Sequence, residues 1–554
     1  MFSFRKSVIA AMAVGMIFTV GACKRSGGSG VTAQGLTSSW QVEEVNSLLA
    51  YVPADAPIVY ASTRNIDMNA PQAKALLAKA AAMYDKSFAQ LEKSGSSLDE
   101  DSKKVLEATK KSIESSVALL KNYQTEAPNW GLEPNGRQDS VFYVNNDVVA
   151  GHVTVVDGAK LKTKMDAVFS SLMVAGETKA FKNSEIGSGD NAWTLYQPDQ
   201  VTDPESPLPT IAVRYGKNLV TFVLVNGAPD VNKLAELTKP AAKGMSKDNL
   251  GTIDKEAMAV GFMDSAKIID LLQLPSVAIL MKAAEVEIDA TCASEYKALA
   301  SSFPRVQFSQ RILNDGKVQA DSTLVFADKA EVKKLQALHS SSVNLKSAKT
   351  IVNAAINVQL DKAIPYLSDL SKVVSAKNFK CDTLQSLAGQ LSSFPELASN
   401  PDVTKYASAV SSISAVVDGF DLTTKKVDAT VDINGAKLGE LMPEITSMLS
   451  ALGAAIEIKK DEVTNFDLTP LIQWPVVINM TYTDTDFVVA TTEHDVKALA
   501  KSSKSATTNF AEVGVSFKIL SSIADLGDTF NDVSYDFALG TNDDGLRFSM
   551  IIGL

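Results

Sequence analysis

Hydrophobic and polar residues follow two different periods along this chain, and the two periods predict a mixture of strands and helices. Apolar residues occupy mostly alternate positions in 318–326 and again in 427–433, and a period of two is typical of half-buried antiparallel strands. Between residues 71 and 125 the apolar residues recur at helical spacing, with a break at Ser94-Gly95-Ser96. This segment is therefore predicted to be a helical hairpin.

Some combinations of elements occur more than once in the sequence. They are a hairpin followed by a helix (211–235 and 476–500), a strand leading into a helix (259–271, 355–367 and 513–523), and a hairpin whose second strand alternates (ending at 326 and at 433). In the first combination an aspartate, Asp230 or Asp495, directly precedes the helix, and aspartate is a favoured N-cap. Such recurrence predicts that the chain contains two related halves.

These patterns together predict an α+β fold in which antiparallel sheets have helices packed on one face. A chain of 554 residues is too long for one compact domain. We expect two α+β halves, 41–345 and 346–554, with the helical hairpin 71–125 inserted in the first. Two turn sequences, Asn314-Asp315-Gly316 and Asn542-Asp543-Asp544-Gly545, are of the hairpin type, and a final strand is expected from Leu546 onward.

The start of the chain has a different pattern. Arg5 and Lys6 precede an apolar stretch of about 13 residues, Val8 to Val20, and roughly 20 residues are needed to span a bilayer. A basic start, a short apolar middle and small residues before a cleavage point are typical of a secretory signal peptide. Residues 1–22 are therefore predicted to be such a peptide.

The signal peptide ends in the run Val20-Gly21-Ala22-Cys23, which resembles the lipobox of bacterial lipoproteins. Val20 stands where leucine is commoner in that pattern. The resemblance implies cleavage before Cys23, a diacylglycerol on its sulfur, and fatty acyl chains such as palmitate as the membrane anchor. Two or more such chains anchor a protein stably, whereas one binds only marginally.

Small polar residues follow Cys23 up to residue 40, among them Ser26-Gly27-Gly28-Ser29-Gly30. We interpret 23–40 as the lipidated cysteine and a flexible tether, whose root-mean-square reach is roughly 20–24 Å. Lys24 stands where an aspartate often marks retention in the inner membrane. By this resemblance, the outer membrane, facing the periplasm, is the expected location.

A second resemblance lies in Tyr51-Val52-Pro53-Ala54-Asp55-Ala56-Pro57. This stretch resembles the opening of a family of large uncharacterised proteobacterial lipoproteins that start with Tyr-x-Pro-Ala-Asp-x-Pro. The family implies no particular activity. The resemblance therefore supports the lipoprotein interpretation without adding a chemistry.

Composition and charge exclude some classes of partner. Hydrophobic residues make up 45% and charged residues 21% of the chain, which is ordinary for globular proteins. The net charge is −11, whereas nucleic-acid binding depends on clustered Lys and Arg. The same charge disfavours electrostatic adhesion to anionic lipids. Attachment to the membrane is therefore expected to rest on the lipid anchor.

Beyond Cys23 the only cysteines are Cys292 and Cys381. In an oxidising compartment two cysteines are expected to form one disulfide, which would close a loop of about 90 residues. The alternative is a pair of buried free thiols, which behave as small hydrophobic side chains.

The sequence offers few candidates for catalysis or metal binding. The three histidines, His152, His339 and His494, do not have the spacing of a zinc helix, and no nucleophile elbow or phosphate loop is present. Asp432-Ile433-Asn434-Gly435 resembles the middle of a calcium loop, but Thr430 and Leu441 stand at the first and twelfth positions. We interpret it as a strand end that meets a turn, and we expect no catalytic residue, no metal and no cofactor.

Aromatic and sulfur-containing side chains allow weaker expectations. Four tryptophans, Trp40, Trp130, Trp193 and Trp474, could line a ligand groove, although tryptophans this far apart more often fill cores. Met442 and Met448 lie in or beside an apolar stretch and are expected in the core.

The function expected from the sequence is that of a non-enzymatic, lipid-anchored protein of the bacterial envelope with a binding or scaffold role. Its partners would be the membrane, through the anchor, and other envelope proteins. Two alternatives stay open. One is an envelope hydrolase with dispersed catalytic residues, and the other is a carrier of an apolar ligand.

Overall fold

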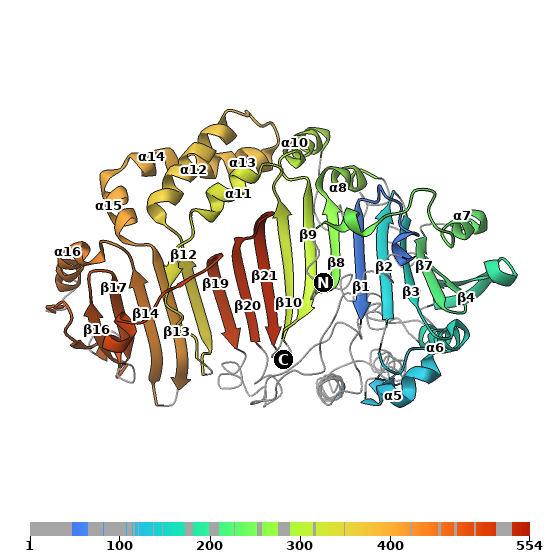
Figure 1. Ribbon diagram of the computed structural model, residues 1–554, viewed down its shortest axis with the longest axis horizontal. Coiled ribbons are helices and arrows are strands. Elements are labelled where there is room, and N and C mark those ends of the chain that lie inside the picture. Colours follow the sequence, from blue (N-terminus) through green and yellow to red (C-terminus); the bar gives the residue numbers. More distant parts are fainter. Residues whose placement is uncertain are drawn as a thin grey trace. The chain divides into compact units, whose positions relative to one another are not determined.

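The fold is seen in a computed structural model of the chain (Figure 1). It describes residues 47–64, 81, 107, 114, 117–119, 121–136, 138–146, 148–171, 181–198, 210–225, 228–251, 257–274, 289–313, 317–347, 349–421, 424–451, 456–469, 474–491, 495–516 and 534–553. Cys23, the predicted signal peptide and tether, and nearly all of the predicted hairpin 71–125 lie outside the described residues. So do the turn Asn314-Asp315-Gly316 and His494.

The chain forms two compact units. The first comprises residues 1–288 and 305–320, and the second comprises 289–304 and 321–554. Both consist of antiparallel sheet and helices, which confirms the predicted α+β class. The unit boundary and the predicted boundary at 345 differ for residues 289–304 and 321–345, which lie in the second unit.

In the first unit, neighbouring strands follow one order across the sheet. They are β4 (Phe181–Ile186), β5 (Trp193–Pro198), β6 (Thr210–Tyr215), β7 (Leu219–Val225), β3 (Val148–Thr154), β2 (Gln138–Asn145), β1 (Ile58–Arg64), β8 (Ala257–Asp264) and β9 (Arg305–Ile312). The helices are α5 (Tyr123–Glu126), α6 (Gly158–Ser171), α7 (Val231–Glu236) and α8 (Ser265–Leu272).

The second unit repeats this order from β5 onward, and β4 has no counterpart among its described strands. Its strands are β15 (Thr464–Asp467), β16 (Val477–Tyr482), β17 (Asp486–Thr491), β14 (Lys426–Asn434), β13 (Ser412–Asp421), β12 (Val352–Asn357), β19 (Asn509–Ser516), β20 (Ser534–Thr541) and β21 (Gly545–Gly553). Strand β10 (Val318–Val325) pairs with β21 and belongs to this unit from Asp321 onward. Its helices are α10 (Ala290–Ala300), α11 (Lys329–Gln336), α12 (Leu360–Ser375), α13 (Asp382–Leu391), α14 (Phe394–Ser399), α15 (Pro401–Ala409), α16 (Leu438–Ala451) and α18 (Val496–Ala500). A separate small ribbon pairs β11 (Ser341–Ser342) with β18 (Ser505–Ala506).

The register of the strands confirms that the halves are related. Strand β1 lies between β2 and β8, as β12 lies between β13 and β19. The register of β8 against β9 shifts between Ala257 and Ala259, and that of β19 against β20 shifts between Asn509 and Ala511. In each case the shift ends at the residue that pairs with the neighbouring strand at the same position. Ala259 pairs with Ser62 of β1, and Ala511 pairs with Ile356 of β12. A bulge shared at one position is a feature of related folds.

The first predicted repeat is confirmed in detail. Strands β6 and β7 lead into α7, and β16 and β17 lead into α18. The Asp230 carboxylate accepts hydrogen bonds from the N–H groups of Asn232 and Lys233. Asp495 does the same at the start of α18. Both aspartates are therefore N-caps, as expected.

The other repeats need correction, because similar patterns do not always occupy equivalent places. Strand β8 is equivalent to β19, but β12, which also leads into a helix, is equivalent to β1. Of the alternating hairpins, β13 with β14 is equivalent to β2 with β3. Helices α12 to α15 lie between β12 and β13, the place that residues 65–137 occupy between β1 and β2. A long insertion at this point is thus common to both halves.

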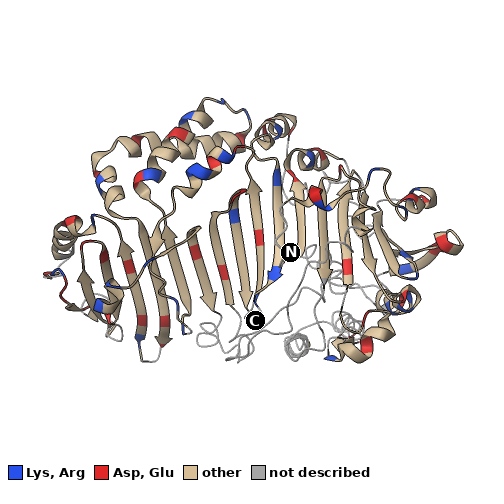
Figure 2. Cartoon of the chain, viewed as in Figure 1, with Lys and Arg blue, Asp and Glu red and all other residues tan. Residues whose placement is uncertain are grey.

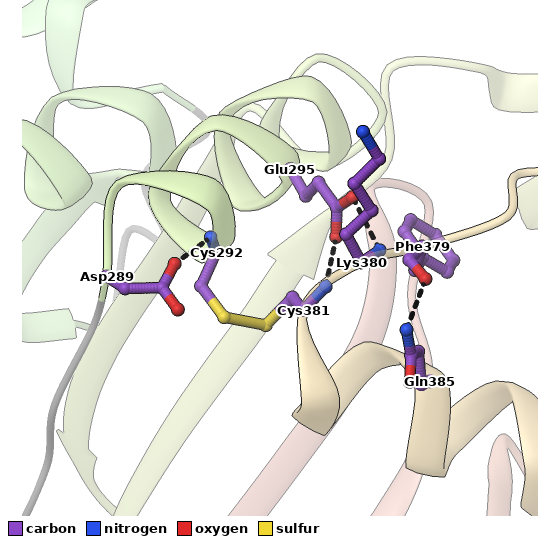
Figure 3. Close-up of a disulfide and its surroundings, with 7 residues drawn as sticks. All are labelled: Asp289, Cys292, Glu295, Phe379, Lys380, Cys381 and Gln385. Atoms are coloured by element: carbon purple, nitrogen blue, oxygen red, sulfur yellow. Dashed lines mark hydrogen bonds between the residues drawn. A yellow bond between two sulfur atoms is a disulfide. The ribbon is translucent and has the colours of Figure 1, made fainter.

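The second unit contains the disulfide that the sequence predicted (Figure 3). It joins Cys292 on α10 to Cys381, the residue before α13. The carboxylate of Glu295 accepts hydrogen bonds from the N–H groups of Lys380 (2.8 Å) and Cys381 (3.0 Å). One side chain of α10 thus satisfies two backbone N–H groups directly before α13.

The first unit contains a row of aromatic rings that glycines make possible. Phe308, Tyr60, Phe142 and Phe222 lie along one face, with ring centroids 6.1, 6.2 and 5.1 Å apart in that order. Gly261 on β8 pairs with Tyr60 on β1 and with Phe308 on β9, so it lies between these two residues in the sheet. Rings of neighbouring strands fill the space above such a glycine, a recognised way to support glycine in a sheet.

We expect the substitution Gly261→Ala to destabilise the first unit by about 3 kcal/mol. A Cβ atom at Gly261 would meet both the Phe308 ring and the backbone carbonyl oxygen of Val59, and the backbone cannot move aside without breaking the sheet. Urea unfolding monitored by circular dichroism measures the change.

The control is Gly389→Ala on α13, where nothing lies near the added Cβ. It should leave stability unchanged or raise it by up to about 1 kcal/mol, because alanine favours helix over glycine. Equal effects of the two substitutions would contradict the packing argument.

Candidate binding surface

Five adjacent strands of the second unit, β13, β12, β19, β20 and β21, present one face that carries no charge. The register places three side chains from each strand on this face. In strand order they are Ile413, Ala415 and Val417; Val352, Ala354 and Ile356; Ala511, Val513 and Val515; Tyr535, Phe537 and Leu539; and Phe548, Met550 and Ile552. The Tyr535 hydroxyl is their one polar side-chain group. Figure 2 shows how sparse charged residues are along these strands.

Large apolar side chains on this face are open to solvent. Exposed fractions lie between 40% and 53% for one residue from each strand: Ile356, Ile413, Val513, Phe537 and Phe548. Val513 and Phe537 are direct cross-strand partners, as are Ile356 and Ile413. The exposed side chains therefore form one contiguous area, which we call the apolar face. Contiguous exposed apolar areas on soluble domains mark interaction or ligand sites.

The opposite face of the same strands is polar and covered. Asn353, Asn357, Ser412 and Ser414 are all buried there. The covering segments include residues 340–347, in which the Ser340 hydroxyl donates to the carbonyl oxygen of Ser411. Nearby, the Lys346 ammonium pairs with Asp536 at 3.1 Å. In these five strands polar side chains are buried and large apolar ones are exposed, the reverse of the usual arrangement.

A buried carboxylate lies on this covered face. Asp432 on β14 is 1% exposed, and neither of its oxygens has a hydrogen-bond partner among the described residues. Burial, and secondly the negative charge of Asp486, raise the pKa of Asp432 to about 7, while the cation of Lys504 opposes the shift. As the sequence predicted, the residue belongs to a strand just before a turn. Its burial was not predicted.

Two aspartates close to Asp432 in the sheet or in its turns, Asp486 and Asp484, have ordinary partners. Lys504 pairs with Asp486 at 2.9 Å, and Asn434 Nδ2 donates to the same carboxylate at 2.8 Å. Asp484, in the turn before β17, pairs with Lys460 at 2.6 Å. Among the described residues, no group of three or more His, Cys, Asp or Glu side chains could hold a metal ion.

The described histidines lie in separate packed environments. His152 is fully buried between the rings of Tyr51 and Tyr143, and its Nδ1 lies 3.1 Å from the Thr221 hydroxyl. Burial lowers the pKa of His152 to about 4, so the ring is neutral at physiological pH. His339 stacks on Phe510 and lies 2.7 Å from the Thr541 hydroxyl. Among the residues that the structure describes, no Ser or Asp side chain is hydrogen-bonded to His152.

The three tryptophans that the structure describes are not brought together. Trp130 and Trp193 fill two different cores of the first unit, and Trp474 stacks on Phe420 in the second. Trp40 lies outside the described residues. Met442 is buried in the core under α16, as expected, but Met448 is 59% exposed. The expectation for Met448 was wrong because it lies on the outer side of α16.

No helix in the described part of the chain is both long enough and apolar enough to span a bilayer. No protein-family model and no curated protein matches the sequence.

Among solved structures, the chain is similar to crystal form III of TP0453, a membrane-associated lipoprotein of Treponema. That match has 8% identity, covers 54% of this chain and 89% of the other, and has a TM-score of 0.24. Crystal form I of the same protein matches with 6% identity, coverages of 53% and 87%, and a TM-score of 0.23. This is a distant structural resemblance to a lipoprotein, and at such scores it carries no argument about fold or role.

Proposed function

We propose that this protein is a lipid-anchored lipoprotein of the bacterial envelope, on the periplasmic side of the outer membrane, that acts by binding and not by catalysis. The apolar face is the single observation that carries the binding role. The lipobox at Cys23 supports the location. In this proposal the alternative of an apolar-ligand carrier becomes the specific form of the binding role.

We infer that the ligand of the apolar face is a fatty acyl chain. Protein interfaces form about one hydrogen bond per 100–200 Å². The apolar face has the Tyr535 hydroxyl as its one polar side-chain group, and its backbone groups pair within the sheet. An acyl chain needs no hydrogen bonds, and its burial against exposed aliphatic and aromatic side chains is favourable at about 25 cal/mol per Å².

The experiment is photo-crosslinking in intact membranes with a diazirine-bearing fatty acid, followed by peptide mapping. We expect labelled peptides from β12, β19, β20 and β21. The double substitution Phe537→Asp with Phe548→Asp should reduce this labelling at least tenfold, because it places two charges where an acyl chain would lie. Both side chains are half exposed, so the variant should fold.

The matched control is Val373→Asp on α12, a residue that is 60% exposed in the same unit but away from the apolar face. It should label like the wild type. Labelling confined to other segments, or unaffected by the double substitution, would contradict acyl-chain binding at this face.

The anchor itself is tested by Cys23→Ala. This substitution removes the sulfur that the lipobox resemblance marks for modification. We expect the precursor to remain uncleaved, as it should also in wild-type cells treated with globomycin, and palmitate incorporation to be lost. Metabolic labelling and gel mobility measure both effects. Normal processing of the variant would show that Cys23 is not the lipid site.

A further inference from the structure

The buried polar side chains of the second unit form a small array around Asp432. Ser414 lies directly opposite Asp432 in register, and Thr430 lies two residues away on the same face of β14. Side chains in such positions have Cβ atoms roughly 5–7 Å apart. Ser412 lies two residues from Ser414 on β13. These four residues come from two paired strands and are at most 5% exposed.

None of these four side chains has a hydrogen-bond partner among the described residues. The unpartnered atoms are the hydroxyl oxygens of Ser412, Ser414 and Thr430 and both carboxylate oxygens of Asp432. Buried polar atoms are nearly always satisfied in native proteins, and each unsatisfied group costs roughly 1–3 kcal/mol. Four such side chains next to each other therefore indicate an occupant that supplies interactions to oxygen atoms.

The charged groups near Asp432 indicate which charge the occupant carries. Among the described residues, Asp486 on β17 and Lys504 before β18 are the charged groups that act on Asp432. Lys504 is 2.9 Å from the Asp486 carboxylate, so these two charges balance. Ionised Asp432 then leaves one buried negative charge without a partner, an arrangement that is strongly unfavourable. A single positive charge would neutralise it.

We propose that Asp432 and the hydroxyl oxygen of Ser414, which faces it across the two strands, form a buried site for a sodium ion. Ser412 and Thr430 lie on opposite sides of this pair, roughly 13 Å apart, so they cannot both contact the same ion. The donor set is all oxygen, with one carboxylate, which suits a hard cation. A monovalent ion balances the single uncompensated charge, whereas a divalent ion would leave an excess charge buried. The site is separate from the apolar face, which lies on the other side of the sheet, so it does not depend on the proposed function.

The test compares thermal unfolding of the purified full-length lipoprotein in a nonionic detergent, in sodium chloride and in choline chloride of equal ionic strength at pH 8. We expect sodium at ten or more times its Kd to raise the Tm of the second unit by roughly 3 °C or more. The variant Asp432→Asn should fold and lose this sodium effect, because it keeps the shape but removes the charge. Asp361→Asn, at an exposed carboxylate on α12, should retain it.

Sodium-23 NMR gives a second readout. The line width of the sodium signal should increase with wild-type protein and not with Asp432→Asn. The proposal is overturned if the Tm is the same in sodium and in choline and if wild-type protein broadens the sodium signal no more than Asp432→Asn does, which would leave ordered water in the array. It is also overturned if potassium or calcium stabilises the protein and sodium does not.

Discussion

In sodium-free buffer at pH 8, Asp432→Asn is expected to be more stable than the wild type by about 4 kcal/mol. The pKa of the Asp432 carboxyl is raised from 3.8 to about 7 by burial and by Asp486. Between these two values the folded state keeps a proton that the unfolded state releases. The wild type therefore loses stability as the pH rises from about 4 to about 7, and above that it bears the full cost of a buried charge.

Urea unfolding in choline buffer at pH 8, pH 6 and pH 4 measures this difference. The advantage of Asp432→Asn should shrink at pH 6 and nearly vanish at pH 4, where the carboxyl is largely protonated in both states. Asp361→Asn should differ little from the wild type throughout, because its side chain is exposed. A constant difference at all three pH values would show that the asparagine acts through packing and not through charge.

Removal of the disulfide has the other large expected effect. The double substitution Cys292→Ser with Cys381→Ser should lower the free energy of unfolding of the second unit by about 2–5 kcal/mol. The bond joins residues 89 apart in sequence and therefore restricts a long loop in the unfolded chain. Equilibrium unfolding in guanidinium chloride, monitored by fluorescence, measures the change.

Wild-type protein in reducing agent should show the same loss, and the double variant should be insensitive to reduction. The hydrogen bonds from Lys380 and Cys381 to Glu295 remain possible without the bond between sulfurs. They are expected to keep α10 beside α13 in the folded state. A loss smaller than about 1 kcal/mol would indicate that unfolded-state restriction contributes little here.

Local signals in the sequence correctly predicted several features. The N-caps Asp230 and Asp495 depend only on the residues that follow them, and the hairpin at Asn542 depends on a short turn motif. The two cysteines could pair only with each other once Cys23 is assigned to lipid. The relation between the halves was visible in one repeat because β6, β7 and α7 keep the same spacing as β16, β17 and α18.

Other features depended on contacts between distant segments. The sequence placed Asp432 correctly in a strand before a turn, but its burial requires α18 and the ribbon of β11 and β18 to cover that face. Asp486 begins β17, and Lys504 and Asn434 reach it only in the folded sheet. Equivalence of β12 with β1 became visible only through strand neighbours, because single strands resemble one another.

The sequence by itself determined the class of elements and which side chains share a face of each strand. The residues up to Cys23 also determined the expected cellular location. Only the tertiary structure decided which face of the second sheet is covered. A period of two shows which side chains share a face of a strand, but it does not show which face is buried. The segments that pack on the sheet decide which face is buried. Here those segments cover the polar face of these strands, and the uncharged face stays exposed.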